Sequence, residues 1–385
     1  MARKTTRNAQ GGGTIRQRPN GRWEARFTVG RDPGTGKQVQ RSVYGATQKE
    51  VRKKLAQAVA AIDQGTYTVP SKLTVGGWLD IWTAEYLGGV KPRTAELYKT
   101  SVNTYVRPAL GALKLDTLNA HTIQSFYNSL SNDRGLSPKT VKNVHGIFHK
   151  ALQQAVKIGY LRFHPSDACE LPRVERKEMH PLDENDISHF VEAIKGHRFE
   201  TVYLVTLFTG MRQGEVLGLK WENINFDSGK ITVDHQLQKV GGTFSFVSPK
   251  NGKGRTITAA PFVLSVLKRH RAHQAEQQLK AGQLWQGEGL VFCNEVGHHL
   301  YPNTVYDSFK RIAAKIGIPS ARFHDLRHSY AVAAIRSGDD IKTVQGNLGH
   351  HTAAFTLDVY GHVTEQMQKD SAARMEGFIN SVLNL

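Results

Sequence analysis

The sequence contains very little cysteine. Only Cys169 and Cys293 occur among 385 residues, and they form no CxxC pair. A disulfide framework needs several bridges, and common structural zinc sites need closely spaced thiolates, so neither is indicated. The 17 histidines include no HExxH pair, and we therefore expect no metal site and no cofactor. So few cysteines favour a reducing compartment, the cytoplasm.

The sequence also lacks an apolar run long enough to span a bilayer. Its first residues, MARKTTRNAQGGG, are basic and Gly-rich. They contain no apolar stretch of the kind found in a secretory signal peptide. We expect a protein that remains soluble inside the cell and does not associate with membranes.

Acidic residues are scarce relative to basic ones. The chain has 33 Asp and Glu against 51 Lys and Arg, which gives a net charge of +18. An excess of this size indicates a polyanionic partner, and nucleic acid is the first candidate. The alternative is a soluble protein that is merely basic.

Residues 1–71 predict a small domain with three antiparallel strands and one helix. Turn signals separate short β-prone runs over residues 13–45, and Thr47 can cap a helix that ends at Gly65. This region has fourteen Lys or Arg and four Asp or Glu. A β-ribbon can present arginine to DNA, although a solvated basic face is the alternative. The candidate DNA-binding residues here are Arg16, Arg18, Arg22, Arg26 and Arg41.

Residues 72–170 show helical repeats punctuated by proline and glycine, which predict four or five short helices in a bundle. Basic residues at the helix starts can contact phosphates, and a solvated face is nearly as good an interpretation. These candidates are Lys91, Arg93, Lys139 and Lys142. Residues 171–180 have the composition of a linker.

The C-terminal region, 181–385, is mainly helical with one strand-rich stretch. Arg212 lies in TGMRQGE, at the junction of two predicted helices, where it could simply pair with Glu215. The Asn251–Gly252 pair predicts a β-hairpin with Lys250 at its tip. There Lys250 could give a proton to a leaving oxygen; a solubilising lysine is the alternative, and Lys253 is a rival.

The stretch 323–363 concentrates residues suited to phosphodiester chemistry. His324 and Arg327, in HDLRHSY, project from one side of a helix start. Arginine binds phosphate through two parallel hydrogen bonds, and histidine transfers protons near neutral pH. His350 follows a helix that ends at Gly349, and Tyr360 lies ten residues further on. Taken singly, each has a structural alternative, such as a buried tyrosine.

The ordered motifs TGMRQGE, the hairpin lysine, HDLRH, LGH and LDVYGH resemble those of the tyrosine recombinases, the phage-integrase family. The resemblance implies that Tyr360 attacks the scissile phosphate and forms a 3′-phosphotyrosyl link. It implies that Arg212 and Arg327 hold the phosphate, and that Lys250 protonates the leaving 5′ oxygen. His324 would be the general base towards Tyr360, and His350 would orient the phosphate.

The layout also resembles integrases of temperate phages and conjugative transposons. It implies an arm-type DNA-binding domain (1–71), a SAM-like core-site domain (72–170), a linker (171–180) and a catalytic domain (181–385). The expected partners are double-stranded attachment sites, three further copies of the chain in a tetramer on DNA, and accessory DNA-bending or excision factors.

The expected fold class is α+β, with a small sheet and helix, an all-α bundle, and a mainly α catalytic domain with a small antiparallel sheet. The expected function is integration, and excision, of a mobile element through DNA cleavage and rejoining without metal or ATP. The alternatives are a DNA-binding regulator with a decayed site, a chromosome-dimer resolvase and a type IB topoisomerase-like enzyme.

Overall fold

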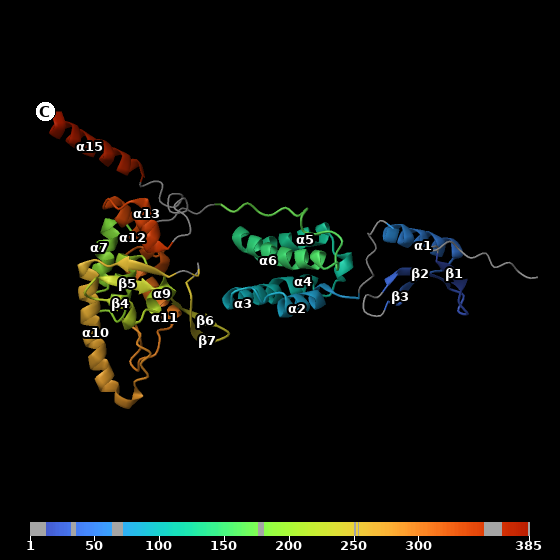
Figure 1. Cartoon of the computed structure of the whole chain (residues 1–385), viewed down its shortest axis with the longest axis horizontal. Helices are drawn as coiled ribbons and strands as arrows, with labels where there is room; N and C mark the ends of the chain where they lie inside the picture. Colours follow the sequence, from blue (N-terminus) through green and yellow to red (C-terminus); the bar gives the residue numbers. More distant parts are fainter. Residues whose placement is uncertain are drawn as a thin grey trace, which may run out of the picture. The chain divides into compact units, whose positions relative to one another are not determined.

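The computed structural model describes most of the chain and divides it into two units, Met1–Glu175 and Arg176–Leu385 (Figure 1). Both units are helical with small antiparallel sheets, so the predicted α+β class is confirmed. None of the described helices is long and apolar enough to cross a membrane. The described residues are 13–31, 36–63, 72–175, 181–249, 252, 254–349 and 364–383.

The first unit begins with a three-stranded antiparallel sheet packed on one helix. The strands pair in the order β1-β2-β3. The helix begins where predicted, because the Thr47 hydroxyl accepts a hydrogen bond from the Glu50 amide at 3.2 Å. Ala25 and Phe27 pack against Val51 and Leu55. The predicted strands and helix are therefore confirmed as β1 (Thr14–Gln17), β2 (Trp23–Arg31), β3 (Gln38–Gly45) and α1 (Gln48–Asp63).

The predicted helical region is a compact bundle. Thr74, Asn119 and Ser137 each cap a helix with a side-chain oxygen, and buried Trp78 donates from Nε1 to the carbonyl of Ala151 at 3.0 Å. This bond fastens the first helix of the bundle to the last. The elements are α2 (Val75–Glu85), α3 (Pro92–Ser101), η1 (Val102–Val106), α4 (Arg107–Leu110), η2 (Leu115–Thr117), α5 (Ala120–Asn132) and α6 (Pro138–Lys157).

The second unit begins at a helix cap, since the Asp183 side chain accepts a hydrogen bond from the Asp186 amide at 2.8 Å. Its helices are α7 (Glu184–Ala193), α8 (Glu200–Thr209), α9 (Gln213–Leu217), α10 (Pro261–Ala281), α11 (Pro302–Lys315), α12 (Phe323–Arg336), α13 (Ile341–Leu348) and α15 (Thr364–Leu383). Its short helices and strands are η3 (Trp221–Asn223), η4 (Gly282–Leu284), β4 (Ile224–Asn225), β5 (Lys230–Val233), β6 (Gln236–Val240), β7 (Thr243–Val247) and β8 (Arg255–Thr258).

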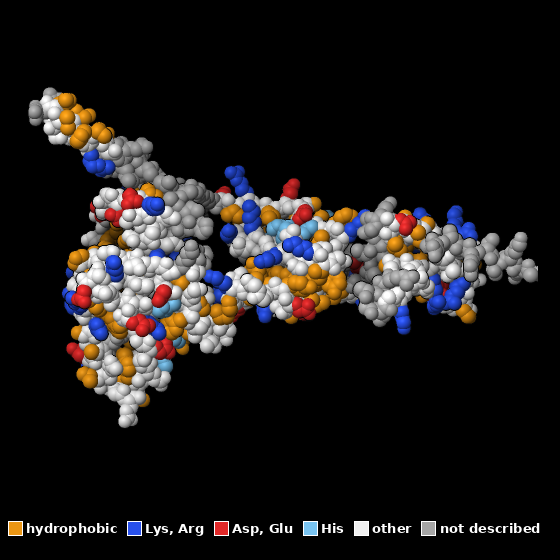
Figure 2. Space-filling view, in the orientation of Figure 1, with side chains coloured by type: hydrophobic (Ala, Val, Ile, Leu, Met, Phe, Trp, Pro, Cys, Tyr) orange, Lys and Arg blue, Asp and Glu red, His pale blue; other side chains and the backbone are white. Residues whose placement is uncertain are grey.

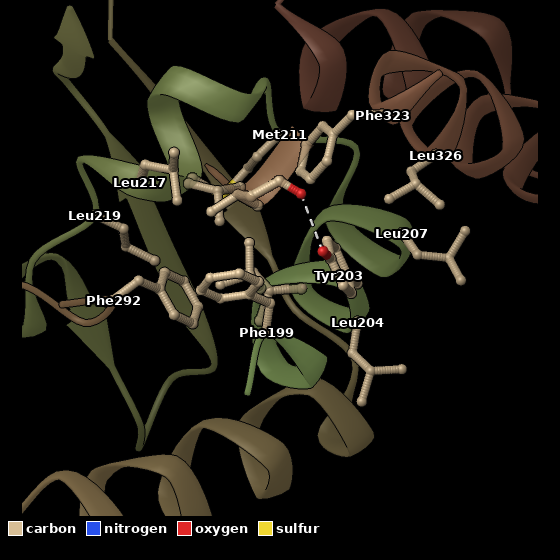
Figure 3. Close-up of a cluster of buried hydrophobic side chains, with 14 of the residues drawn as sticks. Phe199, Tyr203, Leu204, Leu207, Met211, Leu217, Leu219, Phe292, Phe323 and Leu326 are labelled. Carbon is tan, nitrogen blue, oxygen red and sulfur yellow. Dashed lines mark hydrogen bonds between the residues drawn. The ribbon is translucent and has the colours of Figure 1, made fainter. Parts of the chain in front are cut away.

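Helix α8 runs through the middle of the second core. Its apolar residues are buried except Phe208. Tyr203 packs against Phe199 and Phe323 (Figure 3) and also contacts Phe309. The Tyr203 hydroxyl donates to the carbonyl of Val305 at 3.0 Å. Burial raises the pKa of this phenol to about 12, so it stays protonated and keeps that bond.

The strand pairing differs from the prediction. The strand before Asn251–Gly252, β7, pairs with β6, whereas the strand after it, β8, pairs with β5. The segment between β7 and β8 therefore joins two sheets, and the predicted β-hairpin between these strands is wrong. The hairpin formed by β6 and β7 is closed by Gly241–Gly242. Both residues have positive φ, as a two-residue type I′ turn requires.

Gly210 shapes the turn between α8 and α9. It has φ 66° and ends α8. A Cβ atom on Gly210 would lie 2.4 Å from Cδ1 of Tyr330 and 2.8 Å from Cδ2 of Leu348. Only glycine therefore lets α12 and α13 pack directly on this turn.

We predict that Gly210→Ala lowers the stability of the C-terminal unit by about 2 kcal/mol or more, because it adds a steric clash to backbone strain. Gly196→Ala is the matched control, since Gly196 has φ 69° but nothing lies within 4 Å of its Cβ position. Thermal unfolding of both variants measures the difference. Equal losses would contradict the packing argument.

Candidate active site

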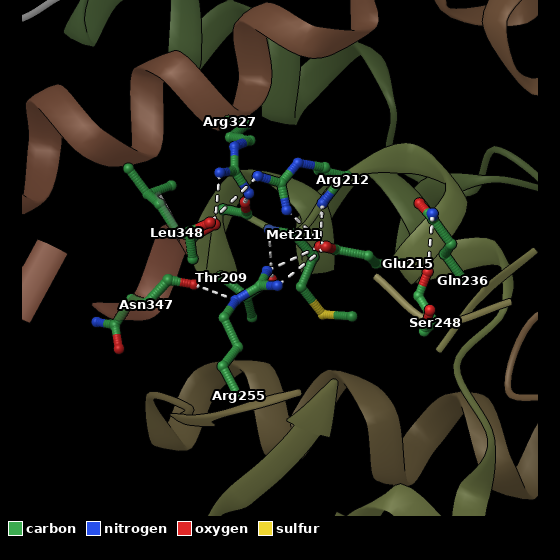
Figure 4. Close-up of polar contacts among 12 residues, drawn as sticks. Thr209, Met211, Arg212, Glu215, Gln236, Ser248, Arg255, Arg327, Asn347 and Leu348 are labelled. Carbon is green, nitrogen blue, oxygen red and sulfur yellow. Dashed lines mark hydrogen bonds and ion pairs between the residues drawn. The ribbon is translucent and has the colours of Figure 1, made fainter. Parts of the chain in front are cut away.

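Arg327, the fifth residue of α12, is held deep inside the second unit. The residue is 2% exposed. It donates to the carbonyl of Gly210 at 2.7 Å through Nη1 and to that of Leu348 at 2.5 Å through Nη2 (Figure 4). One guanidinium thus joins the α8–α9 turn to the end of α13, two segments that are far apart in the sequence.

Arg212 approaches the same place from the other side of the turn. It is the N-terminal cap residue of α9, and its side chain is 23% exposed. Its Nη1 donates to Glu215 Oε1 at 2.8 Å, and its Nη2 lies 3.4 Å from the carbonyl oxygen of Gly349. The structure therefore brings Arg212 and Arg327 to neighbouring carbonyls at the end of α13. The pairing with Glu215, considered from the sequence as an alternative to a site, is also present.

Glu215 is a buried carboxylate among arginines, and its side chain is 0% exposed. Burial raises the pKa of its carboxyl, but hydrogen bonds and charge from Arg255, together with the amide and charge of Arg212, outweigh burial and lower the pKa to about 2. Glu215 is therefore ionised, and it holds both the backbone and the side chain of Arg212.

Arg255, on β8, is the second partner of Glu215. Its Nη1 and Nη2 donate to the two carboxylate oxygens of Glu215 at 2.9 and 2.7 Å, and its Nε donates to the carbonyl of Asn347 at 2.6 Å. A Cβ atom at Gly349 would lie 3.0 Å from Cδ of Arg255, so glycine permits this approach. Arg255 thereby ties β8, α9 and α13 together.

Sequence reasoning missed the role of this Arg255–Glu215 pair. From the sequence, pairing with Glu215 is only a structural alternative to a functional role for Arg212. Arg255 lies 40 positions from Glu215, and nothing local distinguishes it from other strand arginines. The one usable signal was Glu215 itself, because a carboxylate in an otherwise apolar helix requires a partner.

His324 lies beside Arg327 at the start of α12. Burial lowers the pKa of its imidazole to about 4, and the charges of His328 and Arg327 add to this effect. The rings of His324 and His328 meet edge to face, with centroids 4.8 Å apart. His324 is therefore neutral at pH 7 and able to accept a proton, as a general base must be.

Three predicted site residues, Lys250, His350 and Tyr360, lie outside the described residues, as does the rival Lys253. The described chain reaches Gly349, where φ is 63° and α13 ends. The structure thus brings together Arg212, Arg327 and His324.

The predicted DNA-binding arginines of the first unit do not share one face. Arg16, Arg18 and Arg26 surround Glu24, which is 1% exposed, with Nε–Oε distances of 2.8, 3.1 and 3.4 Å. Arg41 pairs in register with buried Phe27 and so lies on the side that α1 covers. Arg16, Arg18 and Arg26 therefore form one basic surface. Arg22 is exposed in the adjoining turn.

The predicted basic residues of the helical bundle are exposed at two helix starts. Lys91 and Arg93 begin α3, whereas Lys139 and Lys142 lie in the first turns of α6. Arg93 is paired with Glu96 at 2.8 Å. All four are accessible to a ligand at their helix starts.

Two protein-family models match this chain. The model of the phage integrase family matches residues 180–367, and that of the phage integrase N-terminal SAM-like domain matches residues 74–131. The first covers most of the unit that contains Arg212, His324 and Arg327, and the second covers the helical bundle from α2 into α5.

Curated proteins match along nearly the whole chain. A tyrosine recombinase XerC-like protein of Caldanaerobacter subterraneus subsp. tengcongensis is 29% identical, over 90% of this chain and 93% of its own. The ICEBs1 integrase of Bacillus subtilis is 24% identical, over 95% of this chain and 100% of its own.

Solved structures share the fold. The Tn1549 transposon integrase in complex with transposon right end DNA has a TM-score of 0.67 and 21% identity, over 79% of this chain and 100% of that one. A lambda integrase dimer bound to a COC′ core site has a TM-score of 0.57 and 18% identity, over 90% of this chain and 94% of that one.

We predict that Glu215→Gln destabilises the C-terminal unit by about 3 kcal/mol, because two arginines lose their buried counter-charge. Glu295→Gln is the control, since the exposed Arg198–Glu295 pair should contribute less than about 1 kcal/mol. Thermal or urea unfolding compares the two. A loss at Glu215 as small as that at Glu295 would show that the buried network is not a stabilising element.

A second prediction concerns pH. The folded state holds the pKa of His324 at about 4, below the unfolded value of about 6.5. Its contribution to stability is therefore complete above pH 6.5 and is lost as pH falls towards 4, because the unfolded chain binds the proton first. Urea unfolding between pH 7.5 and about 5 should show a steeper loss of stability in the wild type than in His324→Gln. Parallel curves would contradict a depressed pKa.

Proposed function

Because the chain belongs to the phage integrase family of tyrosine recombinases, we propose that it is an integrase that inserts a mobile element into DNA and excises it again. The chain is a site-specific recombinase, an enzyme that cleaves and rejoins DNA strands. The observation that carries the proposal is that Arg212, Arg327 and His324 lie close together, and that both arginines bond carbonyls at the end of α13. In the sequence, α13 is followed directly by the segment that contains His350 and Tyr360. The comparisons do not favour the alternatives, which are a DNA-binding regulator with a decayed site, a chromosome-dimer resolvase and a type IB topoisomerase-like enzyme.

The proposed first step is transesterification at a phosphodiester. The Tyr360 oxygen attacks the phosphorus, the bond to the 5′ oxygen breaks, and a 3′-phosphotyrosyl link forms. An unperturbed tyrosine has a pKa near 10, so neutral His324 takes its proton. Arg212 and Arg327 bind the non-bridging oxygens and stabilise the added negative charge of the transition state.

The departing 5′ oxygen needs a proton, and Lys250 supplies it in this scheme, with Lys253 as the alternative donor. His350 hydrogen-bonds the phosphate. The phosphotyrosyl link keeps the energy of the phosphodiester, so a 5′ hydroxyl from another duplex can reseal the strand by the reverse reaction. The scheme requires no metal ion and no ATP.

DNA is the substrate and partner in this proposal. Among the related solved structures, the Tn1549 integrase is in complex with transposon right end DNA, and a lambda integrase tetramer is bound to a Holliday junction. By extension, this chain binds attachment sites as an oligomer, and exchange of two strands between two duplexes requires four protomers. Accessory bending or excision factors belong to the proposal, as does a cytoplasmic, DNA-associated location.

Helix α15 supports assembly between copies. It carries large apolar side chains that are 38–63% exposed, a costly arrangement for an isolated helix. We assign this apolar face to a neighbouring protomer, with packing on its own unit as the alternative. Its members are Met375, Phe378, Ile379, Val382 and Leu383.

The remaining regions are assigned as expected from the sequence. Residues 1–71 bind arm-type sites, mainly through the arginines around Glu24. Residues 72–170 bind the core site with Lys91, Arg93, Lys139 and Lys142 facing phosphates. Residues 171–180 link them to the catalytic domain, 181–385.

We predict that the wild type forms a protein–DNA adduct resistant to SDS on a nicked duplex that carries its attachment site, and that Tyr360→Phe forms none. The nick lets the short strand diffuse away, so the covalent intermediate accumulates. Tyr301→Phe, which removes an exposed hydroxyl from the same unit, should form the adduct normally.

Each failure identifies another function. No wild-type adduct would favour a DNA-binding regulator. Relaxation of supercoiled DNA without site preference would favour a topoisomerase. An adduct in Tyr360→Phe would show that another residue is the nucleophile.

A further inference from the structure

Three side chains with metal-binding atoms converge at the end of the helical bundle. His149 lies on α6, and His164 and Asp167 lie in the loop that follows it. Asp167 Oδ1 is 3.0 Å from His149 Nε2 and 3.2 Å from His164 Nδ1, and all three candidate ligand atoms lie within 4.8 Å of one another. Figure 2 shows histidine side chains gathered over α5 and α6.

The contacts of His164 determine which of its nitrogens carries the proton. Its Nε2 is 2.9 Å from the carbonyl oxygen of His149. A carbonyl oxygen only accepts, so Nε2 must donate, and in the neutral ring Nδ1 then carries a lone pair. That lone pair faces Ser166 Oγ at 3.3 Å and Asp167 Oδ1 at 3.2 Å.

This arrangement requires a positive charge between the groups. The Ser166 hydroxyl can donate to His164 Nδ1, but an ionised Asp167 carboxylate cannot. A nitrogen lone pair and a carboxylate oxygen at 3.2 Å repel each other unless a proton or a metal ion lies between them. One divalent cation would satisfy both nitrogens and the oxygen at once.

The alternative is a second proton on His164 alone, which would donate from Nδ1 to Asp167 while neutral His149 donates from Nε2 to the same carboxylate. The rings of His149 and His164 stack with centroids 3.9 Å apart, so an imidazolium charge on one ring would lie directly against the other ring. The ring of His145, 5.3 Å from that of His149, adds a third titratable group on the same side. A metal ion avoids placing charge on any of the rings.

We propose that His149 Nε2, His164 Nδ1 and Asp167 Oδ1 bind a divalent transition metal of the zinc class. Two imidazole nitrogens and one carboxylate oxygen are ligands that Zn²⁺ accepts, and a water molecule completes four-coordination. Metal–ligand bonds of about 2.0–2.1 Å require the three atoms to draw together by a small movement of the loop.

The surroundings are those of a usable site. His164 is 8% exposed, and its outer N–H is fixed by a backbone carbonyl, as is common for metal-bound histidines. Asp167 is 65% exposed, so an ion can enter from solvent. The site is structural, and it is independent of the proposed recombinase chemistry.

The consequence concerns the end of the bundle. Gln124 on α5 holds Glu170 through two backbone hydrogen bonds, at 2.8 and 3.0 Å. A metal ion at His149, His164 and Asp167 would fasten the preceding loop to α6 as well. The segment that leads to residues 171–175 would then leave the bundle from a fixed point.

The test is metal binding by the full-length chain after removal of metal with EDTA. We expect ZnCl₂ to bind with one ion per chain and to raise the thermal midpoint of unfolding. We expect CoCl₂ to give visible d–d absorption that zinc displaces. His149→Gln and Asp167→Asn should each weaken binding by about 10–100-fold, whereas His189→Gln, at an exposed histidine of α7, should leave it unchanged.

Several results would overturn the site. These are no saturable binding at micromolar metal, or binding that both His149→Gln and Asp167→Asn retain. A thermal midpoint that follows pH but not zinc would assign the charge to a proton. If a variant fails to fold, X-ray absorption of the wild-type zinc complex decides, because the site requires two imidazoles in the first coordination shell.

Discussion

One buried carboxylate holds together the candidate active site of this recombinase. Glu215 receives a bidentate hydrogen bond from Arg255, and one hydrogen bond each from the side chain and the backbone amide of Arg212. Removing such a group from water is costly, and only the paired guanidinium groups offset that cost. Glu215 also fixes the direction of the Arg212 side chain, because it accepts hydrogen bonds from both the backbone and the guanidinium of Arg212. The Nη2 atom of the guanidinium then lies near the end of α13. A flexible surface arginine could not be positioned so closely.

The second constraint is the close packing of turns around the two arginines. Gly210 and Gly349 adopt positive φ; a Cβ atom would clash with Tyr330 and Leu348 at Gly210 and would lie tight against Arg255 at Gly349. Their backbone carbonyls, with that of Leu348, accept hydrogen bonds from Arg212 and Arg327. The ends of α8 and α13 are therefore part of the site, and the chain towards His350 leaves from this fixed point.

A similar arrangement recurs in the first unit. Glu24, almost fully buried, gathers Arg16, Arg18 and Arg26 on the open face of the three-stranded sheet. In a chain with a net charge of +18, arginines that lie close together repel one another. An acidic residue inside the cluster lowers this repulsion and orders the side chains. Both units thus use a scarce carboxylate to organise basic groups.

The sequence by itself determined the class of fold and most helix boundaries, and it predicted which residues are reactive. Caps such as Asp183, helix-ending glycines and apolar periodicity act locally, and ordered motifs identify a family. Only the tertiary structure decided that Arg255 pairs with Glu215, that β7 pairs with β6, and that His149 meets His164 and Asp167. The Asn251–Gly252 signal misled for the same reason. A turn propensity describes a few residues, whereas burial and pairing across tens of residues select which strands and side chains meet.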